Sequence, residues 1–182
     1  MKVIGVVGLP ASGKGEFSKI ALAMGIPVVV MGDRIREAVL AAGLELTDAN
    51  MGATANRIRA DGGMAAIAKL CIPVIEQQHA PLVLIDGIRG DAEVAIFRRH
   101  FPDFLVIGIN STFENRLKRR GTRGRSDDSA SAADLKLRDE RESGWGLLAA
   151  LNSADRYIEN NGDLEDYAAR VRALLNNLGC GT

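Results

Sequence analysis

Aromatic residues and an excess of either charge are scarce in this sequence. Phe, Trp and Tyr together make up 4% of the 182 residues, which disfavours a surface that stacks several bases. Lys and Arg number 23, as do Asp and Glu, so the net charge of zero points neither to nucleic acid nor to an anionic membrane surface. We therefore expect no dedicated nucleic-acid-binding module.

Long hydrophobic runs and clustered cysteines are also missing. No apolar run approaches the roughly 20 residues of a membrane span, and the short apolar stretch at the start ends in a glycine-rich loop rather than in a signal-peptide pattern. Cys71 and Cys180 lie far apart and match no metal-binding spacing. The sequence thus favours a protein of the reducing cytoplasm that has no membrane segment.

Short apolar runs alternate with helical patterns along the whole chain. Strands are expected at residues 2–8, 27–31, 82–86, 104–109 and 156–159. Helices are expected at residues 14–24, 33–42, 48–60, 64–78, 91–100, 112–120, 130–143 and 164–178. Most of the strands are nearly continuous Val, Ile and Leu, which is typical of strands buried on both faces of a parallel sheet. This alternation predicts a single α/β domain of three layers, joined by right-handed crossovers.

The first expected strand leads directly into Gly8-Leu-Pro-Ala-Ser-Gly13-Lys14, which fits the pattern G-x-x-x-x-G-K. Glycines let the backbone curl so that its N–H groups point at phosphate oxygens, and the helix that follows adds the positive end of its dipole. Lys14 supplies a charge for the outer phosphates. We therefore predict a nucleotide-phosphate loop with contacts from Gly8, Pro10, Ala11, Ser12, Gly13, Lys14, Gly15 and Glu16.

Gly15 stands where many such loops carry the Ser or Thr that binds Mg²⁺. The metal would then be held by phosphate oxygens, water and a carboxylate. Asp86 closes the apolar run 82–86 and is delivered to the carboxyl edge of the sheet, where a metal-bound water would lie. Asp86 is therefore the candidate metal-site acid, and the alternative is a strand-end Asp that caps the turn at residues 87–90.

Arginines that can bind further phosphate groups occur in two stretches. In Gly32-Asp33-Arg34-Ile35-Arg36, Arg36 can form a bidentate phosphate contact, and the alternative is a pair of exposed helix charges. The basic segment 116–128, RLKRRGTRGRSDD, can supply cations to a transferring phosphoryl group from a closing lid. A solvated run of charges or an RNA-contacting loop are the alternatives for this segment. The lid cations that we select are Arg120, Arg123 and Arg125.

The sequence pattern gives less information on two points, namely which arginine of the middle segment faces a site and where the tryptophan lies. Arg57 and Arg59 lie about 200° apart around the expected helix, so only one of them can face a given site, and we select Arg57. Trp145, the single tryptophan, is expected in the core, and the alternative is a stacking platform.

These motifs together resemble the P-loop nucleoside monophosphate kinase superfamily. GLPASGKGEF resembles the adenylate kinase loop, in which Gly also follows the lysine, although Glu16 stands where a Thr is usual. GDRIR and DGIR resemble the G-D-x-x-R and D-G-x-x-R segments of these kinases, with Arg89 one place closer, and GRSDD resembles a short lid. Over nearly its full length the chain is similar to an uncharacterised archaeal family of adenylate-kinase-related nucleotide kinases. Residues 154–162 resemble the last strand and loop of dephospho-CoA kinases.

The resemblance implies the P-loop NTPase fold, an α/β fold whose five-stranded parallel sheet is flanked by helices. An acceptor-binding helical insertion is implied at about residues 32–80 and a short lid at about residues 116–130. ATP and Mg²⁺ are the implied cofactors, with Lys14 on the β- and γ-phosphates. The activity implied is that of an ATP-dependent phosphotransferase acting on a nucleoside monophosphate or a similar small nucleotide.

The acceptor side carries two alternatives. An acceptor phosphate would be bound by Arg36, Arg57 and Arg89 and needs no general base. An acceptor hydroxyl would need one, and Asp33 is then the well-placed candidate. A second hypothesis is a nucleotide-dependent ATPase or switch that acts on a protein or RNA partner.

Overall fold

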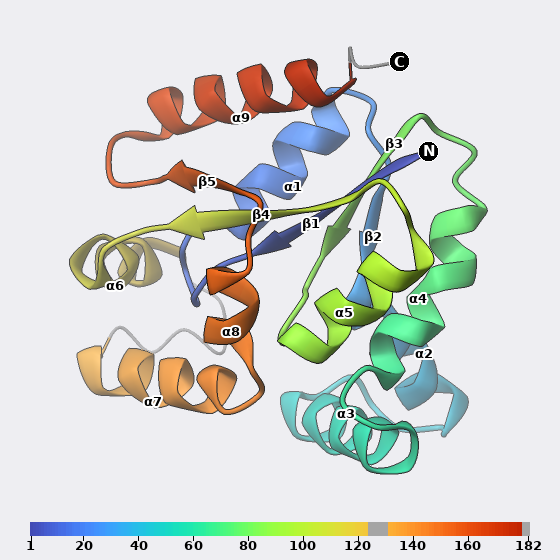
Figure 1. Ribbon diagram of the computed structural model, residues 1–182. Coiled ribbons are helices and arrows are strands. Elements are labelled where there is room, and N and C mark those ends of the chain that lie inside the picture. The colour runs from blue at the N-terminus through green and yellow to red at the C-terminus, as the bar shows by residue number, and fades with distance from the viewer. Residues whose placement is uncertain (124–130, 180–182) are drawn as a thin grey trace.

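The computed structural model describes residues 1–123 and 131–179, and for residues 121–123 it describes the backbone only. Five parallel strands form one sheet in the order β2-β3-β1-β4-β5 (Figure 1). They are β1 (Lys2–Val7), β2 (Val28–Val30), β3 (Leu82–Asp86), β4 (Phe104–Asn110) and β5 (Arg156–Glu159). This arrangement confirms the predicted α/β fold with its five-stranded parallel sheet flanked by helices.

The helices of the described residues follow the expected positions, with one addition. They are α1 (Lys14–Ala23), α2 (Met31–Ala41), α3 (Asp48–Gly62), α4 (Ala66–Glu76), α5 (Asp91–His100), α6 (Phe113–Arg123), α7 (Ala132–Ser143), α8 (Leu147–Asn152) and α9 (Leu164–Gly179). The addition is α8, whose 6 residues are too few to show a helical period and whose N-terminus has no side-chain cap. In the part of the chain that the structure describes, no helix combines the length and apolarity needed to cross a membrane.

Helices cover both faces of the sheet. Helices α1 and α9 lie on one face, while α4, α5 and α8 lie on the other (Figure 1). Because successive side chains of a strand alternate between faces, β1 sends Ile4 and Val6 into the cluster under α1 and α9, and Val3 and Val7 into the opposite cluster. The three layers that the sequence predicts are therefore present.

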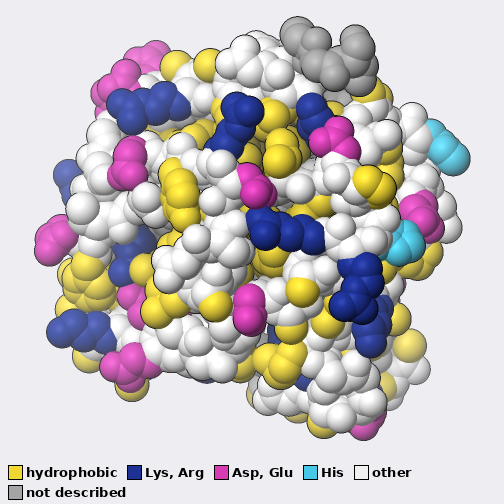
Figure 2. Space-filling view, in the orientation of Figure 1, with side chains coloured by type: hydrophobic (Ala, Val, Ile, Leu, Met, Phe, Trp, Pro, Cys, Tyr) yellow, Lys and Arg dark blue, Asp and Glu magenta, His cyan; other side chains and the backbone are white. Residues whose placement is uncertain are grey.

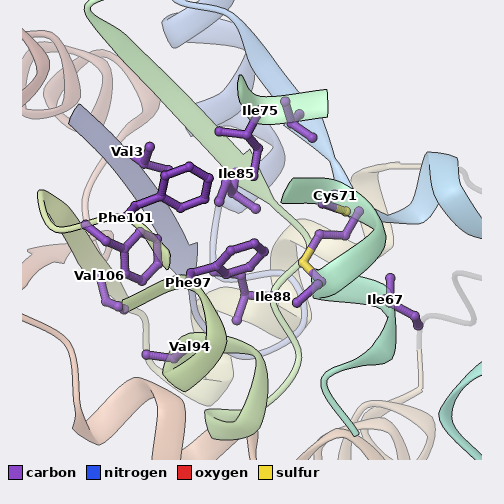
Figure 3. Packing of buried hydrophobic residues seen from close by; sticks show 14 of the residues in the cluster. Val3, Ile67, Cys71, Ile75, Ile85, Ile88, Val94, Phe97, Phe101 and Val106 are labelled. Atoms are coloured by element: carbon purple, nitrogen blue, oxygen red, sulfur yellow. The ribbon is translucent and has the colours of Figure 1, made fainter. Parts of the chain in front are cut away.

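The cluster on the α4–α5 face contains three phenylalanines in contact. Phe97 of α5 packs against Phe101 with ring centroids 6.5 Å apart and against Phe104 of β4 at 5.6 Å. Figure 3 shows Phe97 and Phe101 beside Val106, with Ile85 of β3 in the same layer. This packing fixes β3, β4 and α5 against one another, and so fixes the segment that joins β3 to α5.

The register of the central strands aligns their carboxyl ends. Val6 of β1 and Val30 of β2 both pair with Asp86, the last residue of β3. Ligands of open parallel sheets bind beyond the carboxyl ends of the strands, at the point where the strand order reverses. Here β1 lies between β3 and β4, so this point follows β1.

Candidate functional site

The segment between β1 and α1 forms a curled loop. Ser12 N donates to the carbonyl oxygen of Leu9 at 3.1 Å, and Ala11 takes a left-handed conformation with φ 62°, which is uncommon for a residue with a Cβ. Gly13 has φ 118°, and a Cβ at this position would overlap the Nδ2 atom of Asn160. Only glycine therefore fits where α1 begins.

Two side chains from the last strand and helix hold the carbonyl oxygens of this loop. Asn160, buried just after β5, donates from Nδ2 to the Ser12 carbonyl at 2.8 Å. Tyr167 of α9 donates its hydroxyl to the Gly13 carbonyl at 3.2 Å. Asn160 therefore acts through its side chain on the loop, a role that its place in a turn-like sequence does not indicate.

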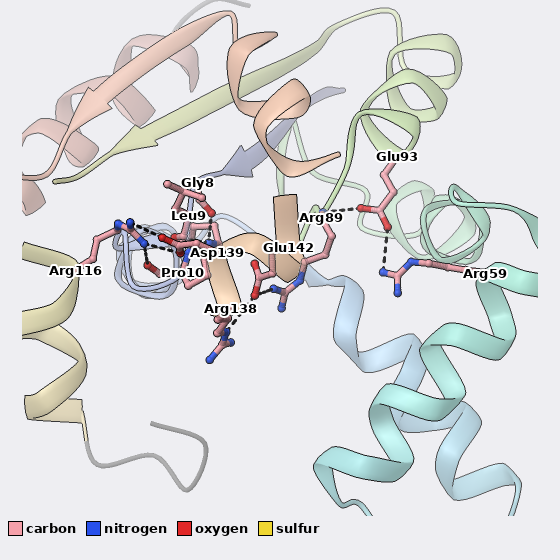
Figure 4. Close-up of polar contacts among 11 residues, drawn as sticks. Gly8, Leu9, Pro10, Arg59, Arg89, Glu93, Arg116, Arg138, Asp139 and Glu142 are labelled. Carbon is pink, nitrogen blue, oxygen red and sulfur yellow. Dashed lines mark hydrogen bonds and ion pairs between the residues drawn. The ribbon is translucent and has the colours of Figure 1, made fainter. Parts of the chain in front are cut away.

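A third side chain reaches the loop from α6. Arg116 donates from Nη1 to the Pro10 carbonyl at 3.1 Å and forms a two-pronged ion pair with Asp139 of α7, at 2.8 and 2.7 Å. In Figure 4 the loop lies between Arg116 on one side and Arg89 with Glu142 on the other. Arg116 thus ties α6, α7 and the loop together.

These contacts orient the N–H groups of the loop. In a planar trans peptide the C=O and N–H point in opposite directions, so the N–H groups of Ala11, Gly13 and Lys14 point away from the three side chains that hold the carbonyls. The first N–H groups of a helix also lack acceptors within that helix. Residues Pro10 to Gly15 line a cavity of about 320 Å³ that none of these three side chains lines. The cavity wall therefore offers N–H donors to an anion.

Lys14 lies in the same wall. Its Nζ donates to the carbonyl oxygens of Gly8 and, at 3.1 Å, of Leu9. Burial, and next the neighbouring guanidinium of Arg89, lower the pKa of Lys14 to about 8. A bound phosphate group would stabilise the charged form of Lys14, so the site suits a polyanion.

Asp86 also lines this cavity, and it has a partner that the sequence does not mark. The hydroxyl of Ser18, buried on α1, lies 2.9 Å from Oδ2 of Asp86 and 3.1 Å from the Lys14 carbonyl. Ser18 follows Lys14 by one helical turn and so shares its face of α1. This spacing from Lys14 is the sequence signal that points to Ser18. The Ser18 hydroxyl lies near the Asp86 carboxylate, whereas Gly15 has no hydroxyl.

The donors present fit a phosphate-bound metal ion. Within residues 1–123 and 131–179 there is no group of three or more His, Cys, Asp or Glu side chains that would hold a metal by itself. Asp86, with one oxygen contacted by Ser18, fits a metal whose other ligands are phosphate oxygens and water.

A buried ion cluster faces the loop across the cavity. Glu142 of α7 contacts Nη1 of Arg89 at 2.6 Å and Nε of Arg138 at 3.2 Å. Burial alone would raise the pKa of Glu142, but Arg89, Lys14 and Arg138 outweigh burial and hold it below its usual range. Glu142 is not selected from the sequence, because nothing local reveals that α7 packs beside the loop. Arg138 lies near the place of the arginine that follows the lid in adenylate kinases, but it is not at the usual spacing and is not selected for that reason.

A second buried carboxylate lies at the start of α5. Glu93 accepts from the backbone N–H of Arg89 at 2.6 Å and lies 3.7 Å from Nη2 of Arg59 (Figure 4). Burial raises the pKa of Glu93, and the backbone N–H of Arg89 and the guanidinium of Arg59 only partly oppose this rise. Arg59 lines the cavity, whereas Arg57, the arginine selected from the sequence, is exposed and lies outside the cavity lining. The helical pattern does not give the rotation of α3 about its axis, and that rotation decides whether Arg57 or Arg59 faces the cavity.

The remaining selected residues are distributed as follows. Arg36 lines the cavity and forms an ion pair with Asp33, which itself does not line it. Glu16 contacts Lys19 at 3.3 Å on the surface of α1 and is also absent from the lining. Gly8 contributes its carbonyl to Lys14.

Of the lid expected at about residues 116–130, residues 116–123 belong to α6 and residues 124–130 lie outside the described residues. Arg120 is buried on α6 and lines a second, neighbouring cavity. Arg123 ends α6, with only its backbone described, and Arg125 lies outside the described residues.

Trp145 corrects another expectation. It is only partly buried, and it lies with its ring near the guanidinium groups of Arg59 and Arg141 rather than in either hydrophobic cluster. Trp145 lies in the turn between α7 and α8 rather than in a helix or strand that packs into the core.

Comparison with known proteins agrees with this geometry. A family model described as an AAA domain matches residues 7–134. Among solved structures, TT1252 from Thermus thermophilus is similar with a TM-score of 0.62 at 18% identity, over 97% of each chain. Shikimate kinase from Aquifex aeolicus is similar with a TM-score of 0.56 at 16% identity, over 99% of each chain. At these identities the likeness shows the fold alone, which is that of P-loop kinases.

A much closer sequence relative fixes the family. The UPF0200 protein of Methanoculleus marisnigri is 62% identical over 179 residues, which span 98% of each chain. The resemblance to an archaeal family of P-loop, kinase-like proteins is confirmed, and the chain belongs to the UPF0200 family.

Proposed function

We propose that this protein is an ATP-dependent kinase that transfers the γ-phosphate of ATP to a nucleoside monophosphate or a similar small nucleotide. The observation that carries the proposal is a single cavity whose lining combines the phosphate loop and Asp86 with the arginines Arg36, Arg89 and Arg138. The loop and Lys14 suffice for one nucleotide. The additional arginines support a second phosphate-bearing substrate in the same space.

The donor half of the site follows from the loop. The N–H groups of the loop and the Lys14 ammonium bind the ATP phosphates, and Gly8, through its carbonyl, positions that ammonium. Bound Mg²⁺ would neutralise charge on the phosphate oxygens, and Asp86, oriented by Ser18, is the side chain that would hold its water shell. Catalysis of this kind depends on positioning and charge rather than on covalent chemistry by the protein.

The acceptor half is formed by arginines. Arg36 and Arg89 would bind the acceptor phosphate, with Arg59 in the role predicted for Arg57. Asp33 pairs with Arg36 and does not line the cavity, which supports an acceptor that is already anionic and needs no general base. Arg120, Arg123 and Arg125 remain the proposed lid cations that stabilise the transferring group.

An ATPase or switch acting on a protein or RNA partner is the second candidate. The observation that favours it is Glu142, which already neutralises Arg89 and Arg138 and so reduces the charge available to an acceptor. The viewed face of the molecule carries basic and acidic side chains interspersed rather than in one basic patch (Figure 2), which offers no support for an RNA partner on that face.

A transfer screen with γ-labelled ATP and Mg²⁺ tests the proposal. The acceptors are the ribo- and deoxynucleoside monophosphates, dephospho-CoA and shikimate, beside a reaction without acceptor. Lys14→Ala should abolish transfer, while Lys19→Ala, a change at a lysine of the same helix whose side chain is 76% exposed, should leave it intact. Label that appears only as free phosphate, equally with and without every acceptor, would contradict the kinase and favour the second candidate.

A further inference from the structure

A second cavity lies beside the first. Its volume is about 730 Å³, and its walls come mainly from α3 and α7. Arg59 and Arg138 line both cavities, so the two adjoin at these side chains. A volume of several hundred Å³ is the size of a small-molecule site.

The wall of the second cavity combines cations with one aromatic ring. Arg59 and Arg141 place their guanidinium carbons 5.3 and 5.7 Å from the ring centroid of Trp145. Arg120 and Arg138 also line it, against two carboxylates, those of Asp48 and Asp134. The wall therefore has both a flat apolar surface and an excess of positive charge.

Trp145 is held on a rigid backbone. The backbone N–H of Trp145 donates to the Glu142 carbonyl at 3.1 Å, and Gly146 after it has φ 92°. A Cβ on Gly90, the residue before α5, would overlap the Trp145 carbonyl oxygen, so the two backbones are in close contact. The backbone that carries the indole is thus held in place beside the cavity, which lowers the entropy cost of ordering the ring for a ligand.

Packing in a hydrophobic cluster does not account for this ring. Trp145 belongs to neither hydrophobic cluster of the described residues and is only partly buried. A large aromatic ring beside two guanidinium groups matches the way proteins bind planar anionic ligands, in which the ring stacks and the cations pair with the acidic groups.

We infer that Trp145 is the specificity residue of the acceptor site, where it stacks the planar base of a nucleotide while Arg59, at the junction of the two cavities, binds its phosphate group. This inference rests on the proposed kinase function. Because Arg59 and Arg138 line both cavities, the anionic end of a ligand in the second cavity lies at the junction, toward the phosphate loop. The acceptor class is therefore an aromatic nucleotide and not a non-aromatic hydroxy acid or sugar phosphate.

The single tryptophan makes the test direct. Fluorescence of Trp145 is followed, without ATP, while adenosine, guanosine, cytidine and uridine monophosphates are added, with ribose 5-phosphate and inorganic phosphate as non-aromatic probes. At least one nucleoside monophosphate should change the fluorescence in a saturable way, with an affinity at least tenfold higher than that of ribose 5-phosphate. The same titration in Lys19→Ala should give the same affinity, because that exposed side chain of α1 lines neither cavity.

Calorimetry with variants completes the test. Trp145→Leu should weaken binding of the best nucleoside monophosphate about tenfold, Trp145→Phe should retain most of it, and both should bind ATP as the parent protein does. Leu148→Ala, a change at a half-exposed residue of α8 that does not line the cavity, is the matched control and should have no effect.

The outcomes separate this inference from the proposed function. Transfer that depends on Lys14, together with an acceptor KM unchanged by Trp145→Leu or with equal binding of ribose 5-phosphate, overturns the inference and leaves the kinase standing. Nucleotide-specific quenching of Trp145 without any transfer supports the site and contradicts the kinase. Absence of any saturable fluorescence change overturns the inference outright.

Discussion

The hydroxyl of Ser18 lies 2.9 Å from Oδ2 of Asp86, so a helix residue outside the loop motif contacts the carboxylate at the end of β3. The loop itself has Gly15 after the lysine and thus no hydroxyl at that position. Ser18 lies one turn further along α1 and fixes one oxygen of Asp86, which leaves the other free to face a metal-bound water.

Removing the Ser18 hydroxyl should therefore change the Mg²⁺ dependence of transfer. Ser18→Ala is expected to lower kcat about tenfold and to raise the Mg²⁺ concentration needed for half-maximal transfer, because one hydrogen bond to a charged group contributes about 1.5 kcal/mol or more. Ser153→Ala, which removes a hydroxyl bonded to the Ala150 carbonyl, is the control. A Mg²⁺ dependence that is identical in Ser18→Ala and the parent would show that Ser18 does not act through Asp86.

The lowered pKa of Lys14 gives a pH dependence of nucleotide binding. In the ligand-free protein burial and Arg89 favour the neutral amine, with Arg138 adding to this and Glu142 and Asp86 opposing it, so Lys14 loses its charge as pH rises through about 8. Phosphate groups favour the charged form and raise the pKa in the complex, so ATP affinity should be greatest below pH 8 and fall above it.

Calorimetry at pH 8.5 in buffers of different ionisation enthalpy measures this linkage. Binding of ATP should take up a fraction of a proton, and the affinity should fall by up to about tenfold per pH unit above 8. An affinity that is flat or rising between pH 7 and 9.5 would contradict the assigned role of Lys14.

Two tyrosines provide a matched test of how the loop is held. Tyr167 donates to the Gly13 carbonyl in the loop, whereas Tyr157 donates to the Leu151 carbonyl away from it. Each change to Phe removes one hydroxyl hydrogen bond and should cost about 1 kcal/mol or less in the free energy of unfolding. Only Tyr167→Phe should also weaken ATP binding, by about threefold to tenfold in a direct titration. Equal ATP affinity in the two variants would mean that the Tyr167 contact does not shape the loop.

The ion pair between Arg116 and Asp139 should stabilise the protein more than an exposed pair does. It is two-pronged, and only 4% of the Arg116 side chain is exposed. Asp139→Asn leaves this guanidinium without its counter-charge and should lower the free energy of unfolding by about 3 kcal/mol. Denaturant unfolding measures the loss, with Asp155→Asn at the more exposed pair with Arg98 as the comparison, expected at about 1 kcal/mol or less. Similar losses in both variants would rule out a special role for Arg116.

The sequence predicts those parts of the site whose residues lie close together along the chain. The Val- and Ile-rich run of β1, the glycines of the loop and Lys14 all fall within a few residues, and each has a backbone or charge requirement that one residue type meets. Ser18 was missed because its partner Asp86 lies 68 positions away in sequence, and only the sheet register brings them together. Contacts of this kind depend on packing, which a local pattern does not contain.

For the helices of the acceptor side, prediction from sequence is limited in two ways. It does not give the rotation of a helix about its axis, and it does not detect a very short helix. The period of α3 shows that Arg57 and Arg59 face different directions, but which one turns toward the cavity is decided by how Thr54 and Ala55 pack, and these are the buried residues of that helix. Helix α8, with 6 residues, is stabilised by burying Leu147 and Ala150 against the sheet rather than by any local signal. Trp145 is expected in the core, yet it lies in the turn before α8 with its ring near the guanidinium groups of Arg59 and Arg141.

In the proposed reaction, ATP gives its γ-phosphate to a second nucleotide bound in the same site. The most direct measurement is a single-turnover reaction with enzyme in excess over γ-labelled ATP, followed by separation of labelled acceptor from labelled free phosphate. With the best acceptor of the screen, most of the label should appear on the acceptor in the parent protein and in Lys19→Ala, and none in Lys14→Ala. Label that partitions entirely to free phosphate, at a rate that no nucleotide acceptor changes, would contradict a kinase.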